Sequence, residues 1–70
     1  MFTNLKVEML KARVDVNDIS KELGLTTSSI YFKINGKSQW TLKQMQIIKQ
    51  LLESKLKTKL DLEYLFDKGV

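Results

Sequence analysis

The chain lacks cysteine, histidine and proline, and it has only three glycines among its 70 residues. Without cysteine it forms no disulfide bond, and without cysteine and histidine it has no ordinary zinc site. Histidine is also the commonest general base in enzymes. Because the carboxylates are scattered as well, no catalytic pair and no cofactor loop can be assembled. We therefore predict that the protein is not an enzyme and that it has no catalytic residue, no metal and no cofactor.

Long apolar runs are also missing, since the longest contain only two or three residues. A membrane-spanning helix needs about 20 predominantly apolar residues. The first residues, Met1 to Asn4, lack the charged start and the apolar stretch of a secretory signal. We therefore expect a cytoplasmic protein that does not interact with a membrane.

Hydrophobic residues make up 43% of the chain and recur at helical spacing. A chain of this length forms one domain and buries only roughly 60% of the surface that it exposes when unfolded, so a large cleft is not expected. The absence of proline favours helices over loops. We predict a single domain over residues 1–70 with an all-α fold of four to five helices.

Two helices are predicted in the first third of the chain. Asn4 can cap a helix that continues to about Arg13. Asp15 is a good N-cap for the next helix, with Asp18 in the position of a capping-box acid. Gly24 ends this helix, because glycine adopts the left-handed conformation without steric cost. The expected buried residues are Leu5, Met9, Ala12, Ile19 and Leu23.

A third helix is predicted between Thr26, a candidate N-cap, and the turn dipeptide Asn35–Gly36. Ile30 and Ile34 fall on its buried side. The opposite side carries Ser28, Ser29, Phe32 and Lys33. The third helix thus pairs a short apolar face with a polar face that contains one large aromatic ring.

A fourth helix begins with a second capping box, formed by Thr41 and Gln44. Trp40, just before the cap, is expected to pack on Met45 as a hydrophobic staple. The predicted core face of this helix consists of Leu42, Met45, Ile48 and Leu52.

Beyond Leu52 the sequence leaves two readings open. The spacing of Leu56 and Leu60 could continue the fourth helix, or residues 53–59 could be a connector to a short last helix over 62–67. The tail, residues 56–70, is a candidate dimerisation element.

The positive charge is confined to one part of the chain. From Leu23 to Leu52 there is no aspartate or glutamate. The basic residues in this acid-free stretch are Lys33, Lys37, Lys43 and Lys49. The remainder has eight basic and eight acidic residues, so the whole net charge of +4 lies in the acid-free stretch. A surface that binds phosphates must exclude carboxylates, so the position of the charge indicates a nucleic-acid ligand.

In its central part the sequence resembles the lambda-repressor and Cro family of helix-turn-helix regulators. The resemblance covers about Leu5 to Leu52, with the helix-turn-helix unit at about 16–36. The matching residues are Ile19–Ser20, Leu23–Gly24–Leu25, Ile30 and Asn35–Gly36–Lys37–Ser38. The stretch from Tyr31 to Thr41 and the terminal Leu65–Phe66 are most similar to small Cro-like regulators of Gram-positive phages and prophages.

The resemblance implies a DNA-binding transcriptional regulator of phage or prophage type, located in a bacterial host cell. Its third helix would lie in the major groove of double-stranded operator DNA, and a homodimer would bind two half-sites. The residues nearest to base edges would be Thr26, Thr27, Ser28, Tyr31 and Phe32. Lys37, Lys43 and the first amides of the fourth helix, up to Gln44, would hold phosphates. Lys33 belongs to the same basic stretch.

Two differences from the family favour a second reading. Members often place a glutamine at the start of the second helix, where it clamps a phosphate, but this chain has Val16 there and Asn17 beside it. The third helix has no arginine and instead presents Phe32. The alternative is a modulator, or antirepressor, that binds a partner repressor protein through the same face. The predicted DNA-binding or partner-binding residues are Asn17, Thr26, Thr27, Ser28, Tyr31, Phe32, Lys33, Lys37, Lys43 and Gln44.

Overall fold

The computed structural model describes residues 2–67 and is all-helical over this range. The helices are α1 (Thr3–Ala12), α2 (Val16–Leu23), α3 (Thr27–Ile34), α4 (Leu42–Leu56) and α5 (Leu62–Leu65). No strand occurs in residues 2–67. The predicted all-α class with four to five helices is confirmed.

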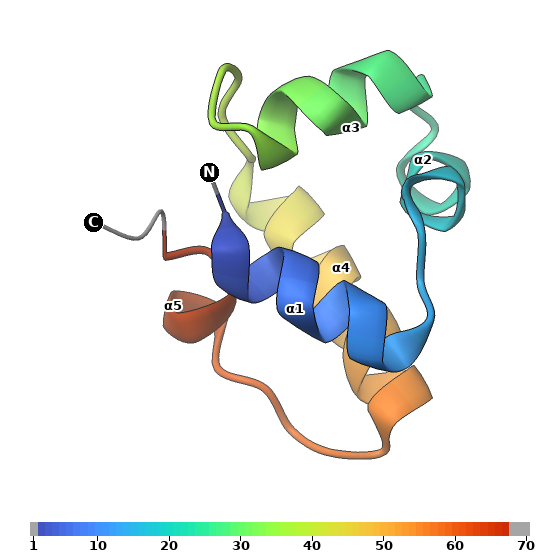
Figure 1. Cartoon of the computed structure of the whole chain (residues 1–70), viewed down its shortest axis with the longest axis vertical. Coiled ribbons are helices and arrows are strands. Elements are labelled where there is room, and N and C mark those ends of the chain that lie inside the picture. Colours follow the sequence, from blue (N-terminus) through green and yellow to red (C-terminus); the bar gives the residue numbers. More distant parts are fainter. Residues whose placement is uncertain (1, 68–70) are drawn as a thin grey trace.

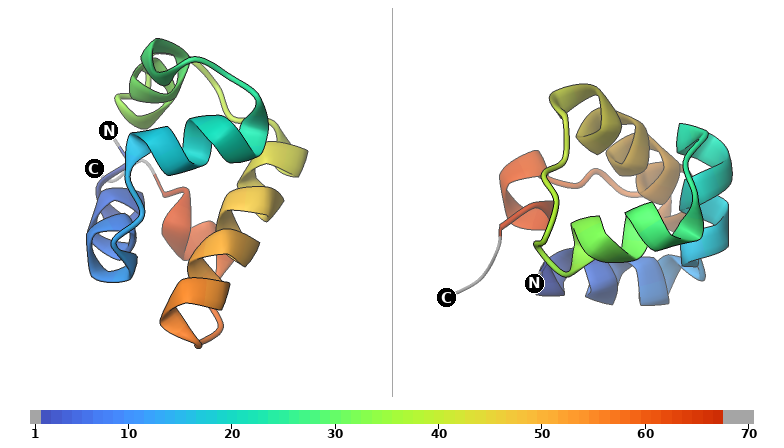
Figure 2. Two further views of the ribbon diagram at one scale, coloured as in Figure 1. Left: turned by 90° about the vertical axis from the view of Figure 1, so that its right-hand side faces the viewer. Right: turned by 90° about the horizontal axis from the view of Figure 1, so that it is seen from above.

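The helices are arranged so that α3 is the most peripheral of them. α1 and α4 pack against each other, and α5 packs against both. α2 contacts α3 and α4, and α3 has α2 as its main helical neighbour. α3 forms the upper edge of the molecule in Figure 1, while α2 is seen nearly end-on beside it. The two helices therefore cross steeply, and the outer side of α3 is left uncovered, as the two further views in Figure 2 also show.

The core is formed by apolar residues from every helix and from the connecting segments. Its buried side chains are Phe2, Leu5, Met9, Val14, Ile19, Ile30, Ile34, Trp40, Ile48, Leu52 and Leu65. Ala12, Leu23 and Met45 are partly buried against it, as expected. The prediction for Leu42 was wrong, because its side chain is 58% exposed. The six steps along the helix from Leu42 to Ile48 rotate by roughly 600° in total, which places the two side chains on different faces.

Most helix ends follow the predicted local signals. The Asp15–Asp18 capping box is formed, with both hydrogen bonds at about 3 Å, and Gly24 is left-handed with φ 68°. The Thr26 hydroxyl accepts a hydrogen bond from the Ser29 amide. A second capping box begins α4, where Thr41 Oγ1 accepts from the amide of residue 44 and the Gln44 side chain accepts from the amide of residue 41.

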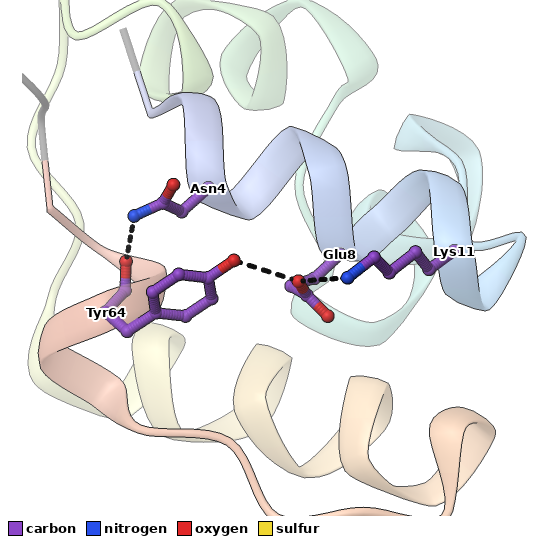
Figure 3. A network of polar contacts seen from close by, with 4 residues as sticks. All are labelled: Asn4, Glu8, Lys11 and Tyr64. Carbon is purple, nitrogen blue, oxygen red and sulfur yellow. Dashed lines mark hydrogen bonds and ion pairs between the residues drawn. The ribbon is translucent and has the colours of Figure 1, made fainter.

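At α1 the predicted cap is wrong. Phe2 occupies the N-cap position without a side-chain cap, and Asn4 lies inside the first turn. The Asn4 amide nitrogen donates instead to the Tyr64 carbonyl, 2.9 Å away in α5 (Figure 3). One turn further along α1, the buried Glu8 carboxylate accepts hydrogen bonds from the Tyr64 hydroxyl at 3.0 Å and from Lys11 Nζ at 3.3 Å. Polar contacts therefore join the two ends of the chain.

The end of α4 resolves the two readings of the tail. α4 continues to Leu56 and ends at Lys57, which is left-handed with φ 55°. The Glu53 carboxylate accepts from the Leu60 amide at 2.8 Å and pairs with Lys49 Nζ at 3.0 Å. The hydrogen bond from Leu60 and the nearby ammonium lower the pKa of Glu53. The first reading is therefore correct as far as Leu56, because residues 53–56 belong to α4 and not to a connector. A shorter connector and a short α5 then follow, as in the second reading, although α5 ends at Leu65 and not at residue 67.

The tail was also a candidate dimerisation element. Within its described part, Leu65 is fully buried, and Leu60 and Phe66 pack against the core of the same chain. Residues 68–70 lie outside the described part. The apolar side chains of α5 thus stabilise this protomer, and dimerisation through the tail stays a prediction.

Tyr64→Phe is expected to lower the melting temperature at neutral pH, because it removes the hydroxyl that donates to buried Glu8. This hydrogen bond and the partial desolvation of the phenol raise the pKa of Tyr64 above 10.0. The stability that Tyr64 contributes is therefore fully present below pH 10 and is lost as the pH rises through the raised pKa. Circular-dichroism melts at neutral and alkaline pH would measure both effects. Tyr31→Phe is the matched control, and equal melts for the two variants would contradict the prediction.

Candidate functional site

The outer face of α3 is open to solvent. Ile30 and Ile34 point into the core, with exposures of 0% and 4%. On the other side Ser28 is exposed, Tyr31 is 56% exposed and Phe32 is 53% exposed. The predicted division of this helix is confirmed for Ile30, Ile34, Ser28 and Phe32, whereas Ser29 and Lys33, which were also assigned to the exposed face, are half-buried. The exposed face offers the hydroxyls of Ser28 and Tyr31 and two aromatic rings to a ligand.

The first residues of α3 are partly committed to the fold. The Thr26 hydroxyl accepts from the Ser29 amide at 3.2 Å and donates to the Ser29 hydroxyl at 3.1 Å. Thr27 and Ser29 are half-buried, whereas Thr26 and Ser28 are exposed. Of the polar side chains at the start of α3, Ser28 is therefore the one best placed to meet a ligand.

The loop after α3 and the start of α4 add positive charge to this region. Lys37 and Lys43 are exposed, and neither side chain makes a hydrogen bond or ion pair within the described residues. The amides of Leu42 and Lys43 make no hydrogen bond within residues 2–67, as expected for the first turn of a helix. Gln44 is half-buried and its side chain completes the capping box. Two lysines and two free amides are thus available for an anion.

Lys33 and Lys49, the other two lysines of the acid-free stretch, have partners in the chain. Lys33 Nζ donates to the Gln39 carbonyl at 2.6 Å and lies 5.7 Å from the centre of the Trp40 ring. Lys49 Nζ forms the ion pair with Glu53. Of the four lysines in the acid-free stretch, Lys37 and Lys43 are therefore the two whose exposed side chains have no partner within the described residues.

Asn17 lies in a different environment, at the start of α2. Its side chain is exposed, and the capping-box carboxylates of Asp15 and Asp18 stand on either side of it in the sequence. Two carboxylates repel a phosphate, and the Asp18 amide is already bonded to Asp15. The start of α2 is therefore a poorer anion site than the start of α4, which has no acid in its first turn.

A shallow apolar pocket of about 260 Å³ lies between α1, α2 and α3. Met9, Val14 and Ile34 form its floor, and Tyr31 and Leu10 stand at its edge. Leu10 is 82% exposed, the highest value for a large apolar side chain in the described residues. This pocket was not predicted, because the apolar face of α1 was defined by Leu5 and Met9. The sequence feature that could have indicated the pocket is Leu10, an apolar residue of α1 that lies off the face formed by Leu5 and Met9.

The site therefore consists of an outward-facing helix, a basic loop and an adjoining apolar pocket. No family model, curated protein or solved structure matches the chain. Its function is therefore inferred from the arrangement of α3, the basic loop after it, the start of α4 and the apolar pocket.

Metal-binding clusters and membrane spans are both absent from the described residues. Residues 2–67 contain no group of three or more side chains able to hold a metal ion. None of the helices in this range has the length and apolar character needed to cross a membrane. The chemistry available at the candidate site is that of hydroxyls, amides, lysines and aromatic rings.

Proposed function

We propose that the protein is a DNA-binding transcriptional regulator of the phage or prophage type. In this proposal α2, the turn at Gly24 and α3 form a helix-turn-helix, and α3 enters the major groove of an operator half-site. The major groove of B-DNA is wide enough to admit one α-helix. A helix that is peripheral, short and uncovered on its outer side fits this requirement.

The observation that carries the proposal is the exposure of Ser28 and Phe32 on α3, followed along the chain by Lys37 and Lys43, whose exposed side chains have no partner within the described residues. A serine hydroxyl donates to or accepts from base edges, and an aromatic side chain contacts the thymine methyl group. The lysines follow α3 in the chain, where they can hold phosphates beside the groove. Base-reading and phosphate-binding groups thus lie on adjoining elements without an intervening carboxylate.

The start of α4 is the proposed phosphate clamp. Its free amides at Leu42 and Lys43 and the positive end of the helix dipole favour an anion, and the Lys43 side chain adds a full charge. The start of α2, where the resembling family often has its clamp, is less suitable here because of Asp15 and Asp18. We therefore assign the clamp to α4, and Asn17 has at most a secondary contact.

One such unit reads a single half-site. Useful affinity then requires two copies whose recognition helices are about 34 Å apart. The apolar residues Leu60, Leu65 and Phe66 of the tail pack in the core of their own protomer, so the predicted homodimer would use exposed residues of the tail or form on the DNA.

The proposal is tested by fluorescence anisotropy with two labelled duplexes, the DNA upstream of the protein's own gene and a scrambled duplex of equal composition. We expect tighter binding to the upstream duplex, with an affinity that falls steeply as salt rises but a preference that survives physiological salt. Weak binding without any preference would contradict an operator-binding regulator.

A second candidate function is favoured by the apolar pocket. Leu10 and Tyr31 stand at the edge of this pocket, and Phe32 is exposed on the same helix as Tyr31. Large apolar side chains exposed around a pocket commonly anchor protein interfaces. The protein would then be a modulator that binds a partner repressor through this face and covers the DNA-contacting surface.

Co-elution separates the two candidates. A modulator is expected to form a stable complex with a repressor encoded beside its gene and to bind short duplexes only nonspecifically. Separate elution of the two purified proteins would contradict this second candidate.

A further inference from the structure

Lys33 is the polar link between α3 and the second half of the loop that follows it. The loop, residues 35–41, begins with backbone bonds to the last turn of α3, from the amide of Gly36 to Lys33 and from the amide of Lys37 to Phe32, at 3.1 and 2.9 Å. Residues 38–40 receive no backbone hydrogen bond from the rest of the described chain. The hydrogen bond that reaches them comes from Lys33 Nζ to the Gln39 carbonyl, at 2.6 Å.

The same ammonium group also lies against the anchor of the loop. Trp40 is 9% exposed, and its ring packs edge-on with Phe2 and Phe66 at centroid distances of 6.4 and 5.6 Å. Lys33 Nζ is 5.7 Å from the centre of the Trp40 ring, within the range of a cation–π contact. The side chain therefore connects α3 both to the loop backbone and to the aromatic cluster of Phe2, Trp40 and Phe66.

We propose that Lys33 is a positioning residue that braces the loop 35–41 against α3, and that it does this instead of binding phosphate. The brace sets the distance between the base-reading face of α3 and the phosphate-binding groups at Lys37 and at the start of α4. Its consequence for DNA rests on the proposed function, whereas the brace itself is a property of the free protein.

The geometry gives the brace a defined chemical requirement. The Gln39 carbonyl needs a donor, and the Trp40 ring face attracts a cation, so the side chain must be long, cationic and able to donate. Arginine meets these conditions, and methionine keeps much of the length of the side chain but supplies neither charge nor donor. Lys33→Met should therefore free the loop 35–41 from α3, and Lys33→Arg should preserve the contact between them.

The first measurement is made without DNA. Trp40 is the only tryptophan, so its fluorescence and its quenching by acrylamide report on the cluster directly, and NMR relaxation of residues 37–40 reports on the loop. We expect Lys33→Met to increase quenching and to lower the order parameters of the loop, with Lys33→Arg close to wild type. Lys37→Gln, which removes an exposed lysine of the same loop, is the matched control and should leave both unchanged. Unchanged loop and tryptophan signals in Lys33→Met would overturn the brace.

The second measurement is the salt dependence of duplex binding. Removing one phosphate contact reduces the slope of log affinity against log salt by about 0.9. We expect Lys37→Gln to reduce the slope by about this amount, and Lys33→Met to keep the slope while affinity falls about tenfold at every salt concentration, because the clamp is misplaced but not removed. A reduced slope in Lys33→Met would overturn the proposal by showing Lys33 to be a phosphate ligand. If the wild-type protein binds no duplex, the proposed function fails, and the measurements without DNA still decide the brace.

Discussion

Replacing Ile30 by alanine is expected to lower the free energy of unfolding by about 2–5 kcal/mol. Its side chain is fully buried and joins α3 to the core, and α3 has few other anchors because its outer side faces solvent. Small domains have total stabilities near the lower end of about 5–15 kcal/mol. The substitution therefore removes much of the stability of this 70-residue chain, and urea or thermal unfolding followed by circular dichroism would measure the change.

Two further variants make this measurement specific. Ile30→Val deletes one methylene and should cost only about 0.5–1.5 kcal/mol. Ser28→Ala changes an exposed residue of the same helix and should stay within about 0.5 kcal/mol of wild type. If Ile30→Ala unfolds at the same urea concentration as wild type, α3 is not anchored through this residue and the arrangement described for it is incorrect.

The features that sequence reasoning predicted well are local. The Asp15–Asp18 and Thr41–Gln44 capping boxes join residues three positions apart, so the pattern that predicts them also contains both hydrogen-bond partners. Gly24 likewise ends α2 for a reason that lies in its own backbone. Buried faces at helical spacing follow from the same short-range geometry.

The predictions that failed depend on which elements meet in space. Asn4 has the composition of an N-cap, but its partner is the carbonyl of Tyr64, 60 residues away. The burial of Glu8 was not among the predictions, because one of its two donors is Tyr64, and no helical pattern identifies a partner 56 residues away. Leu42 was assigned to one core face with Met45, Ile48 and Leu52, but it lies on a different side of α4 from Ile48, and no other element covers that side. Local patterns carry no information about which element covers a given face.

At the candidate site, too, the features set by local sequence were predicted and those set by contacts between elements were not. The outward direction of Ser28 and Phe32 follows from the period of α3 and was predicted. The contacts of Lys33 were not, because a lysine in a basic stretch reads as a phosphate ligand until the Gln39 carbonyl is seen beside it. Asn17 is the converse case, since it was included among the binding residues for lying beside the position where the resembling family often has its clamp, and its acidic neighbours make a phosphate contact there unfavourable.

The double substitution Ser28→Ala with Phe32→Ala is expected to reduce affinity for the upstream duplex at least tenfold. Each good contact to a base edge contributes about 1–3 kcal/mol, and about 1.4 kcal/mol corresponds to a factor of ten. Both side chains are exposed, so the variant should fold with nearly the stability of wild type. Anisotropy titrations of wild type and variant against the upstream and the scrambled duplex would measure the change.

The slope of log affinity against log salt distinguishes base contacts from phosphate contacts in this experiment. Neither substituted residue carries a charge, so the variant removes base contacts while phosphate contacts at Lys37 and Lys43 remain, and the slope should not change. Binding of the double variant to the scrambled duplex should be nearly unaffected, because that binding depends on the phosphate contacts. The control is Ser54→Ala, on the exposed side of α4, which should match wild type on both duplexes. Unchanged affinity of the double variant for the upstream duplex would mean that α3 does not read bases. The exposed rings of Tyr31 and Phe32 would then favour a protein partner. If the same variant also failed to bind the partner repressor, the contact with that repressor would lie on α3.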